Sequence, residues 1–167
     1  QALNGLIESS LPRDEAYRFI SIGRKIERAD MTARILKVAG GDIISREKRY
    51  IDLQAFLWGA LLDALYARSA FRRIKGPVIS KEQTLDFILN CNDFPRSIIH
   101  CVNSIDQEVT NLPDNSEIKK ILKRQKRLVN KYKSDITDYK LINKFNEEFQ
   151  EGLIKINKTL YQQWFER

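Results

Sequence analysis

Three charged residues within eight positions are the strongest candidates for chemistry in this sequence. They are Glu27, Asp30 and Arg34, in the stretch GRKIERADMTARIL at residues 23–36. The stretch has the composition of a helix, on which residues three and four positions apart are neighbours. Two carboxylates at this spacing could perform acid–base chemistry or hold a divalent cation, and the arginine could bind a carboxylate through two hydrogen bonds.

A helical wheel places these side chains on the arc that also carries Phe19 and Ile20. We take this arc as the face that packs against partner helices. Burying an unpaired charge is costly, but the spacing of Glu27, Asp30 and Arg34 allows them to pair. We therefore predict a buried salt-bridge network that holds the helices in one alignment.

Other basic residues bear on this network. Arg24 and Arg28 flank the arc, whereas Lys25 falls on the far side and is expected to face water. A second base from elsewhere in the chain would complete the pairing, and Arg96 and Arg72 are the candidates.

Two other interpretations stay open at this point. In the first, Glu27, Asp30, Arg34 and Arg24 line a ligand-binding or catalytic pocket. In the second, this part of the helix separates from its neighbours and the side chains are simply solvated. Of the three, the buried network is the interpretation that we prefer.

The elements that must position these residues are helices, because no stretch shows the alternation typical of strands. A first helix is predicted over residues 14–38, ended by Gly40 and Gly41. A second is predicted over 50–73, and its middle, 53–65, is apolar almost all round, which predicts a helix buried on most sides.

Capping residues mark the helices that follow. Ser80 and Gln83 form a capping box that opens a short helix through residue 89. Pro95 is predicted to be an early residue of the next helix, because a first-turn position has no hydrogen bond to lose. Asp114 and Glu117 offer a second capping pair.

The last fifty residues predict two helices, or one long helix interrupted near residues 133–138. Both segments keep a three–four spacing of mostly apolar residues, which is typical of a packing stripe. The stripes are Ile118, Ile121, Leu122, Gln125, Leu128, Val129 and Tyr132, then Ile142, Phe145, Phe149, Leu153, Ile156, Leu160 and Trp164. The fold prediction is all-α, a bundle of about five to six helices without β-sheet, forming one domain over residues 1–167.

Composition narrows the function classes. The single methionine is Met31, so we expect a fragment of a longer chain. The longest uncharged apolar run, 55–62, is far shorter than the roughly 18 residues of a membrane span. Cys91 and Cys101 with the single His100 cannot form a zinc site without carboxylates, and we expect reduced thiols. We predict neither a metal site nor a cofactor.

The net charge of +7 is concentrated in one late segment. Residues 116–140 contain nine lysines and arginines against three acids. A solvated basic face is the plain interpretation, and polyanion binding or contact with an acidic partner are the alternatives; the basic patch is Lys119, Lys120, Lys123, Arg124, Lys126, Arg127 and Lys131. Nucleic-acid binding is not favoured, because no recognition motif accompanies the charge.

Three blocks in fixed order carry a family resemblance. RDEAYRFISIGRKIERADMTARIL, LWGALLDALYARSAFRR and TLDFILNCNDFPRSIIHCV, within residues 11–105, resemble the alpha-E family of bacterial all-helical domains of unknown function. The family's Glu-Arg motif corresponds here to Glu27 and Arg28. Members are about twice as long, so the chain resembles their second half.

The resemblance implies a biological context. Alpha-E domains occur with circularly permuted ATP-grasp proteins and transglutaminase-like peptidases, in peptide-modifying systems. It implies motif positions without catalytic roles: Arg24, Glu27, Arg28, Asp30, Arg34, Pro95 and Arg96. No nucleotide-binding, metalloprotease or hydrolase motif occurs in the sequence. We therefore expect a cytoplasmic accessory or interaction domain with a protein partner, such as the ATP-grasp-like protein, and without activity of its own.

Overall fold

The computed structural model describes residues 5, 7, 9–132 and 138–166, and every regular element among them is helical. The all-α prediction is confirmed. The elements are α2 (Glu15–Ile35), a π-helical turn (Leu36–Gly40), α3 (Gly41–Ser45), two 3-10 turns (Glu47–Arg49 and Ile51–Leu53), α4 (Gln54–Ala64), α5 (Arg68–Lys75), α6 (Lys81–Asn90), α7 (Ile98–Thr110), α8 (Ser116–Lys131) and α9 (Tyr139–Trp164).

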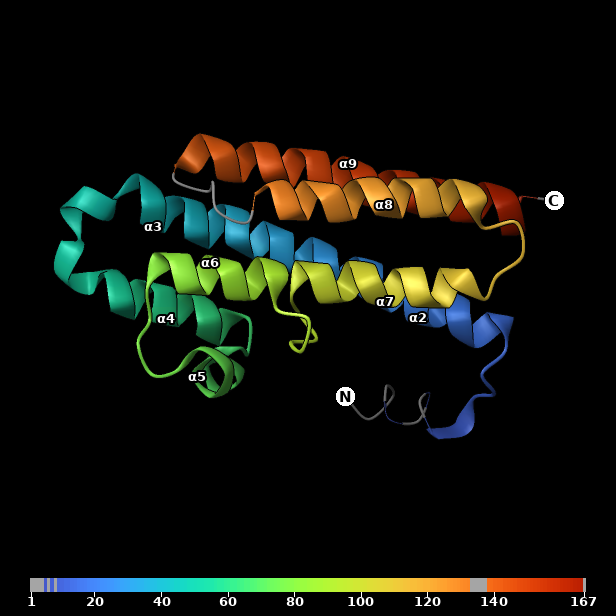
Figure 1. The fold of residues 1–167 in the computed structure, drawn as a ribbon, viewed down its shortest axis with the longest axis horizontal. Helices are drawn as coiled ribbons and strands as arrows, with labels where there is room; N and C mark the ends of the chain where they lie inside the picture. The colour runs from blue at the N-terminus through green and yellow to red at the C-terminus, as the bar shows by residue number, and fades with distance from the viewer. Residues whose placement is uncertain (1–4, 6, 8, 133–137, 167) are drawn as a thin grey trace.

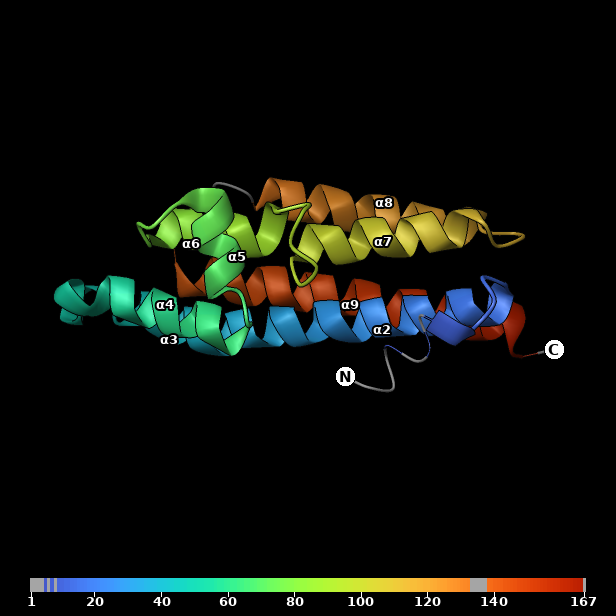
Figure 2. The ribbon, with the colours of Figure 1, turned by 90° about the horizontal axis from the view of Figure 1, so that it is seen from below.

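The long helices α2, α7, α8 and α9 form the body of the described part of the molecule (Figures 1 and 2). In the second view α7 and α8 form one layer, and α2 and α9 form the other. In the first view α6 continues nearly the line of α7, and α4 and α5 lie beside α6 at the same end. The motif helix α2 thus has α7 on one side and α9 on another.

The first predicted helix boundary was wrong. The helix does not stop at Gly40 and Gly41; it passes through a π-helical turn into α3. A Cβ on Gly41 would stand 2.8 Å from the ring of Tyr139 at the start of α9. Gly41 therefore permits a close helix–helix approach, and a glycine used for approach carries the same sequence signal as a glycine that ends a helix.

The second predicted helix is two helices. The chain turns between α4 and α5, where Tyr66 adopts a φ of 54°, and Asp63 pairs with Arg68 across the turn at 2.6 Å. The expectation that 53–65 is buried on most sides was also wrong. Trp58 of α4 is fully buried, but Phe56 on the other side of α4 and Leu53 just before it are 69% and 48% exposed.

Serines cap the next two helices. The Ser80 hydroxyl accepts a hydrogen bond from the Gln83 backbone amide, but the Gln83 side-chain oxygen is buried without a hydrogen-bond partner among the described residues, so only half of the predicted capping box forms. Ser97 caps α7 by accepting from the His100 amide, and its hydroxyl donates to the Cys91 carbonyl. Pro95 therefore lies in the turn before α7 and not in its first turn. The predicted Asp114 cap was wrong as well, because Asn115 precedes α8 and no side chain caps it.

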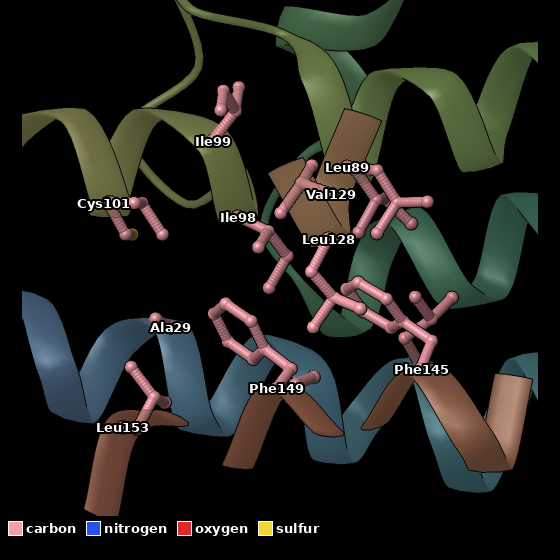
Figure 3. Close-up of a cluster of buried hydrophobic side chains, with 14 of the residues drawn as sticks. Ala29, Leu89, Ile98, Ile99, Cys101, Leu128, Val129, Phe145, Phe149 and Leu153 are labelled. Carbon is pink, nitrogen blue, oxygen red and sulfur yellow. The ribbon is translucent and has the colours of Figure 1, made fainter. Parts of the chain in front are cut away.

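The two C-terminal stripes are confirmed as packing faces. The predicted helix interruption at residues 133–138 falls mainly on residues 133–137, which lie outside the described part. Phe145, Phe149 and Ile156 of α9 are fully buried, as are Leu122 and Val129 of α8. Figure 3 shows the core between the layers, where Phe149 of α9 lies among side chains from α7 and α8. This core fixes where α9 runs, and so shapes the surface beside α2.

Candidate functional site

The buried face of α2 is nearly opposite to the one that the wheel predicted. Ile22, Ala29, Thr32 and Ala33 are buried against the core, whereas Glu27 is exposed. Apart from Ile22, this face is formed by small residues. They contribute little to a count of apolar side chains, although they let α2 lie close to α7. The predicted orientation was wrong for this physical reason.

The predicted ion pair forms, but it is not buried. The Arg34 Nε lies 2.7 Å from Asp30 Oδ2, and the Arg34 side chain is 63% exposed. Gln150 of α9 donates to the other oxygen of Asp30 at 2.9 Å. Within the described residues Glu27 has no ion-pair partner. The buried network is therefore corrected to an exposed pair beside a solitary carboxylate.

Neither candidate for the second base reaches this pair. The Arg96 guanidinium lies over the Tyr66 ring, 5.5 Å from its centroid. The carbonyl of Arg96, and not its side chain, contacts α2, by accepting a hydrogen bond from the Thr32 hydroxyl at 3.0 Å. Arg72 is exposed on α5. The structure thus brings together Glu27, Asp30 and Arg34 and leaves Arg96 elsewhere.

A groove between α2 and α9 opens onto the three motif residues. It consists of two adjoining pockets of about 400 and 270 Å³. We call it the α2–α9 groove; its α2 wall is Phe19, Gly23, Ile26, Glu27, Asp30 and Arg34, and its α9 wall is Gln150, Leu153, Ile154, Asn157, Leu160, Tyr161 and Phe165. One end is charged and the other is aromatic.

The α9 wall was missed by the sequence analysis. Ile154, Tyr161 and Phe165 are 67%, 58% and 59% exposed. They lie seven and four residues apart, so Ile154 and Tyr161 form a second apolar stripe on α9 that Phe165 continues just past its end, turned away from the packing stripe. A search for two stripes on one helix would have found them.

Gly23 lies in the middle of α2 and of the groove. A Cβ at this position would meet no atom within 4 Å, so internal packing does not require glycine. We expect Gly23→Ala to raise the free energy of unfolding by about 1 kcal/mol, because alanine is the better helix former. Urea unfolding measures this change. A loss of stability would show that Gly23 has a structural role after all.

The motif arginine faces a different side of the helix from the motif glutamate. Arg28 donates a hydrogen bond to the carbonyl of Pro95, in the turn before α7, at 3.4 Å. On the same side, Arg18 and Ser21 each donate a hydrogen bond to the Glu108 carboxylate of α7, at 3.3 and 3.0 Å. Glu27 and Arg28 are adjacent in sequence but about 100° apart around the helix, so they serve two surfaces.

Arg24 and Lys25 lie on the Arg28 side. Both line a pocket between α2 and α7 and are half-buried. The expectation that Lys25 faces water was wrong, because this side of α2 is the one that approaches α7.

The basic patch lies on α8, and its residues differ in environment. Lys126 pairs with Asp106 of α7 at 2.7 Å, and Lys120 pairs with Glu117 at 3.4 Å. Lys119 is half-buried. The exposed remainder is Lys123, Arg124, Arg127 and Lys131. A shallow pocket of about 240 Å³ between α8 and α9 lies beneath the last three of these.

The two cysteines and the histidine lie in surroundings that suit packing and hydrogen bonding within the fold. Burial raises the pKa of the Cys101 thiol to about 11, against the opposing charges of Arg28, Lys25 and Arg96. Both thiols are free. His100 Nδ1 lies 2.5 Å from the Asn92 carbonyl. In the part of the chain that the structure describes, no group of three or more acids, histidines or cysteines is placed to hold a metal ion.

Comparison with known proteins identifies one family. The family model Alpha-E, described as "a predicted alpha-helical domain with a conserved ER motif", matches residues 1–165. The match extends beyond residues 11–105 and includes the basic C-terminal third. Searches of curated proteins and of solved structures gave no match. No helix in the described part is both long and apolar enough to cross a membrane.

Proposed function

The chain belongs to the Alpha-E family, and on this premise we propose that it is a helical interaction domain that binds a partner protein through the α2–α9 groove. It has no catalytic activity of its own in this proposal. The family resemblance suggests an ATP-grasp-like protein of a cytoplasmic bacterial peptide-modifying system as the partner.

The exposure of Glu27 supports this proposal most directly. The family is described by its conserved Glu-Arg motif, yet Glu27 is exposed and has no ion-pair partner among the described residues. An exposed carboxylate of this kind contributes little to folding. Conservation of an exposed charged residue without a structural partner indicates binding.

The shape of the groove suggests the kind of partner surface. It runs between two long helices, with exposed apolar side chains on the α9 wall and Gly23 on the α2 wall. Glycine leaves room for a close approach by another chain. An amphipathic helix that buries its apolar stripe and presents a lysine or arginine to Glu27 fits these features.

The catalytic alternative for the same residues has less support. Asp30 is already bound by Arg34 and Gln150, and acid–base catalysis requires a group free to exchange a proton with the substrate. Glu27 would then act alone. Ligand binding at the charged end stays compatible with the open pocket, and it would use the same three residues.

A capture experiment tests the proposal. The protein is immobilised and mixed with an ATP-grasp-like protein, the partner class that the family resemblance suggests, at physiological salt. We expect Glu27→Gln and Gly23→Leu each to reduce capture at least tenfold, because one removes the charge and the other fills the groove. The paired variant Lys123→Gln and Arg127→Gln, which removes two charges from α8, is the control and should leave capture unchanged.

Two results would contradict the proposal. Unchanged capture by both groove variants would show that the partner binds elsewhere. Loss of capture in the α8 control alone would instead assign the interaction to the basic patch, through an acidic partner or a polyanion.

A further inference from the structure

The shallow pocket between α8 and α9 has an uncharged floor and charged walls. Its volume is about 240 Å³, and the two helices that form it run in opposite directions (Figure 1). We call it the α8–α9 pocket. It is separate from the α2–α9 groove, because the two share no lining residue.

The floor contains a buried side-chain amide. Gln125 is 3% exposed and interrupts the apolar stripe of α8 between Leu122 and Leu128. Its Oε1 is buried and has no hydrogen-bond partner among the described residues. A buried polar group without a partner destabilises a fold, whereas an apolar side chain of the same shape does not. Internal packing therefore does not explain a glutamine at this position, and a ligand that pairs with its amide would.

The Gln125 amide lies against the backbone of α9 at Gly152. A Cβ on Gly152 would overlap this amide, and both residues line the pocket. Ile121 and Leu128, one turn to either side of Gln125, make the floor apolar around it. A half-turn of the amide exchanges its oxygen and nitrogen, so it can accept a hydrogen bond from a bound molecule or donate one to it.

The α8 wall of the pocket is cationic. Arg124, Arg127 and Lys131 line it and are exposed. They occupy positions i, i+3 and i+7, so they lie along one face of the helix. Lys131 also lies over the ring of Tyr132, 5.5 Å from its centroid. The two guanidinium groups are the better carboxylate binders of this wall, because each can donate two parallel hydrogen bonds.

The α9 wall carries two acids. Glu148 is half-buried, Glu151 is exposed, and Lys155 follows one turn later. Among the residues that the structure describes, no charged side chain of either wall forms an ion pair. Opposite charges thus face one space without reaching each other. A molecule lying between the walls can contact both.

We propose that the α8–α9 pocket binds a short peptide that has free ends and an apolar side chain. The peptide carboxylate pairs with Arg124 and Arg127, and the peptide ammonium pairs with Glu148 and Glu151. The peptide bond, which has one donor and one acceptor, pairs with the amide of Gln125. The apolar side chain covers the floor.

The lining favours this ligand over a purely anionic one. Glu148 and Glu151 repel a phosphate or a polyanion, and the apolar floor offers nothing to a free ion. The volume is below the roughly 300–1,000 Å³ of pockets for drug-sized molecules. One or two amino-acid residues therefore suit the pocket better than a longer segment.

Peptide titration of the purified chain tests this site independently of any protein partner. Alanyl-leucine is the probe, and backbone amide NMR shifts are recorded. We expect saturable shift changes at Ile121, Gln125 and Gly152. Acetylating the amino end or amidating the carboxyl end should each raise the dissociation constant about tenfold or more, because each removes one charge. Free leucine, which has no peptide bond, should also bind about tenfold more weakly.

Variants assign the contacts. Arg124→Gln combined with Arg127→Gln, and Glu148→Gln alone, should each raise the dissociation constant about tenfold or more. Gln125→Met removes the amide at nearly constant volume, so it should weaken binding by a similar factor. Its melting temperature should be unchanged or higher, because the buried unpaired oxygen is gone. A glutamine with a purely structural role would instead give a lower melting temperature and unchanged binding.

The matched control removes charges just outside the pocket. Lys123 and Lys158 are exposed on α8 and α9 and do not line it, so Lys123→Gln combined with Lys158→Gln should leave the dissociation constant unchanged. Absence of saturable binding, equal affinity for the capped peptides, unchanged binding by Gln125→Met, or an equal loss in the control would overturn the proposal.

Discussion

Phe149→Ala is expected to lower the free energy of unfolding by about 3–5 kcal/mol, the cost of removing a large aromatic side chain from a close-packed core. Phe149 is fully buried and its ring stacks with that of Phe145 at 5.6 Å. It lies in the core between the two layers (Figure 3). A domain stabilised by roughly 5–15 kcal/mol would lose a large share of its stability. Urea unfolding measures the change.

Ile154→Ala is the matched control on the same helix. Ile154 is 67% exposed on the wall of the α2–α9 groove, so its truncation should change stability by no more than about 0.5 kcal/mol. The ratio between the losses of unfolding free energy in the two variants tests which face of α9 is buried in the core. Similar losses for both variants would show that α9 is rotated from the described position.

Gly152→Ala is expected to destabilise the protein by about 1–3 kcal/mol, although alanine is the better helix former. Gly152 of α9 is buried against α8, and a Cβ there would overlap the side-chain amide of Gln125. Gln125 is itself only 3% exposed and lines the pocket between α8 and α9 together with Gly152, so a Cβ at position 152 requires its amide to shift within that pocket. The close approach of α8 and α9 at this point therefore depends on glycine.

A double-mutant cycle separates this contact from helix propensity. In the Gln125→Ala background the overlap is absent, so Gly152→Ala should stabilise by about 1 kcal/mol. The coupling free energy between the two positions should then be about 2–4 kcal/mol. Purely additive effects in urea unfolding would show that the two residues do not touch.

The sequence predicted the C-terminal half well, for a physical reason. The stripes of α8 and α9 contain large side chains such as Phe145, Phe149 and Leu122, and burial of large apolar area decides the orientation of a helix. The three–four spacing of large apolar residues shows directly which face of the helix carries this area. The predicted stripes and the buried faces therefore coincide.

The orientation of α2 could not be predicted in the same way. Apart from Ile22, its inner face consists of small residues, Ser21, Ala29, Thr32 and Ala33, which bury little area individually. They act by allowing a close approach to α7, a property that depends on the opposing helix. The charged residues Glu27 and Arg34 then point outward, where charges are normally found.

Tertiary contacts also determine the helix boundaries that the sequence did not predict. Gly41 allows the approach of Tyr139 from the far end of the sequence, and the turn between α4 and α5 is bridged by Asp63 and Arg68. Of the candidate site, the sequence found Glu27, Asp30 and Arg34 as a group. It did not find their α9 neighbour Gln150, because the pairing of α2 with α9 is a property of the fold.

The unfolding free energy of Glu27→Ala tests the central claim, that the motif glutamate serves a partner and not the fold. In the structure Glu27 is exposed and has no ion-pair partner among the described residues. We predict a stability within about 0.5 kcal/mol of that of the unchanged protein, as for other exposed charges. A loss of about 2 kcal/mol or more would contradict the account, because it would require a buried partner for this carboxylate.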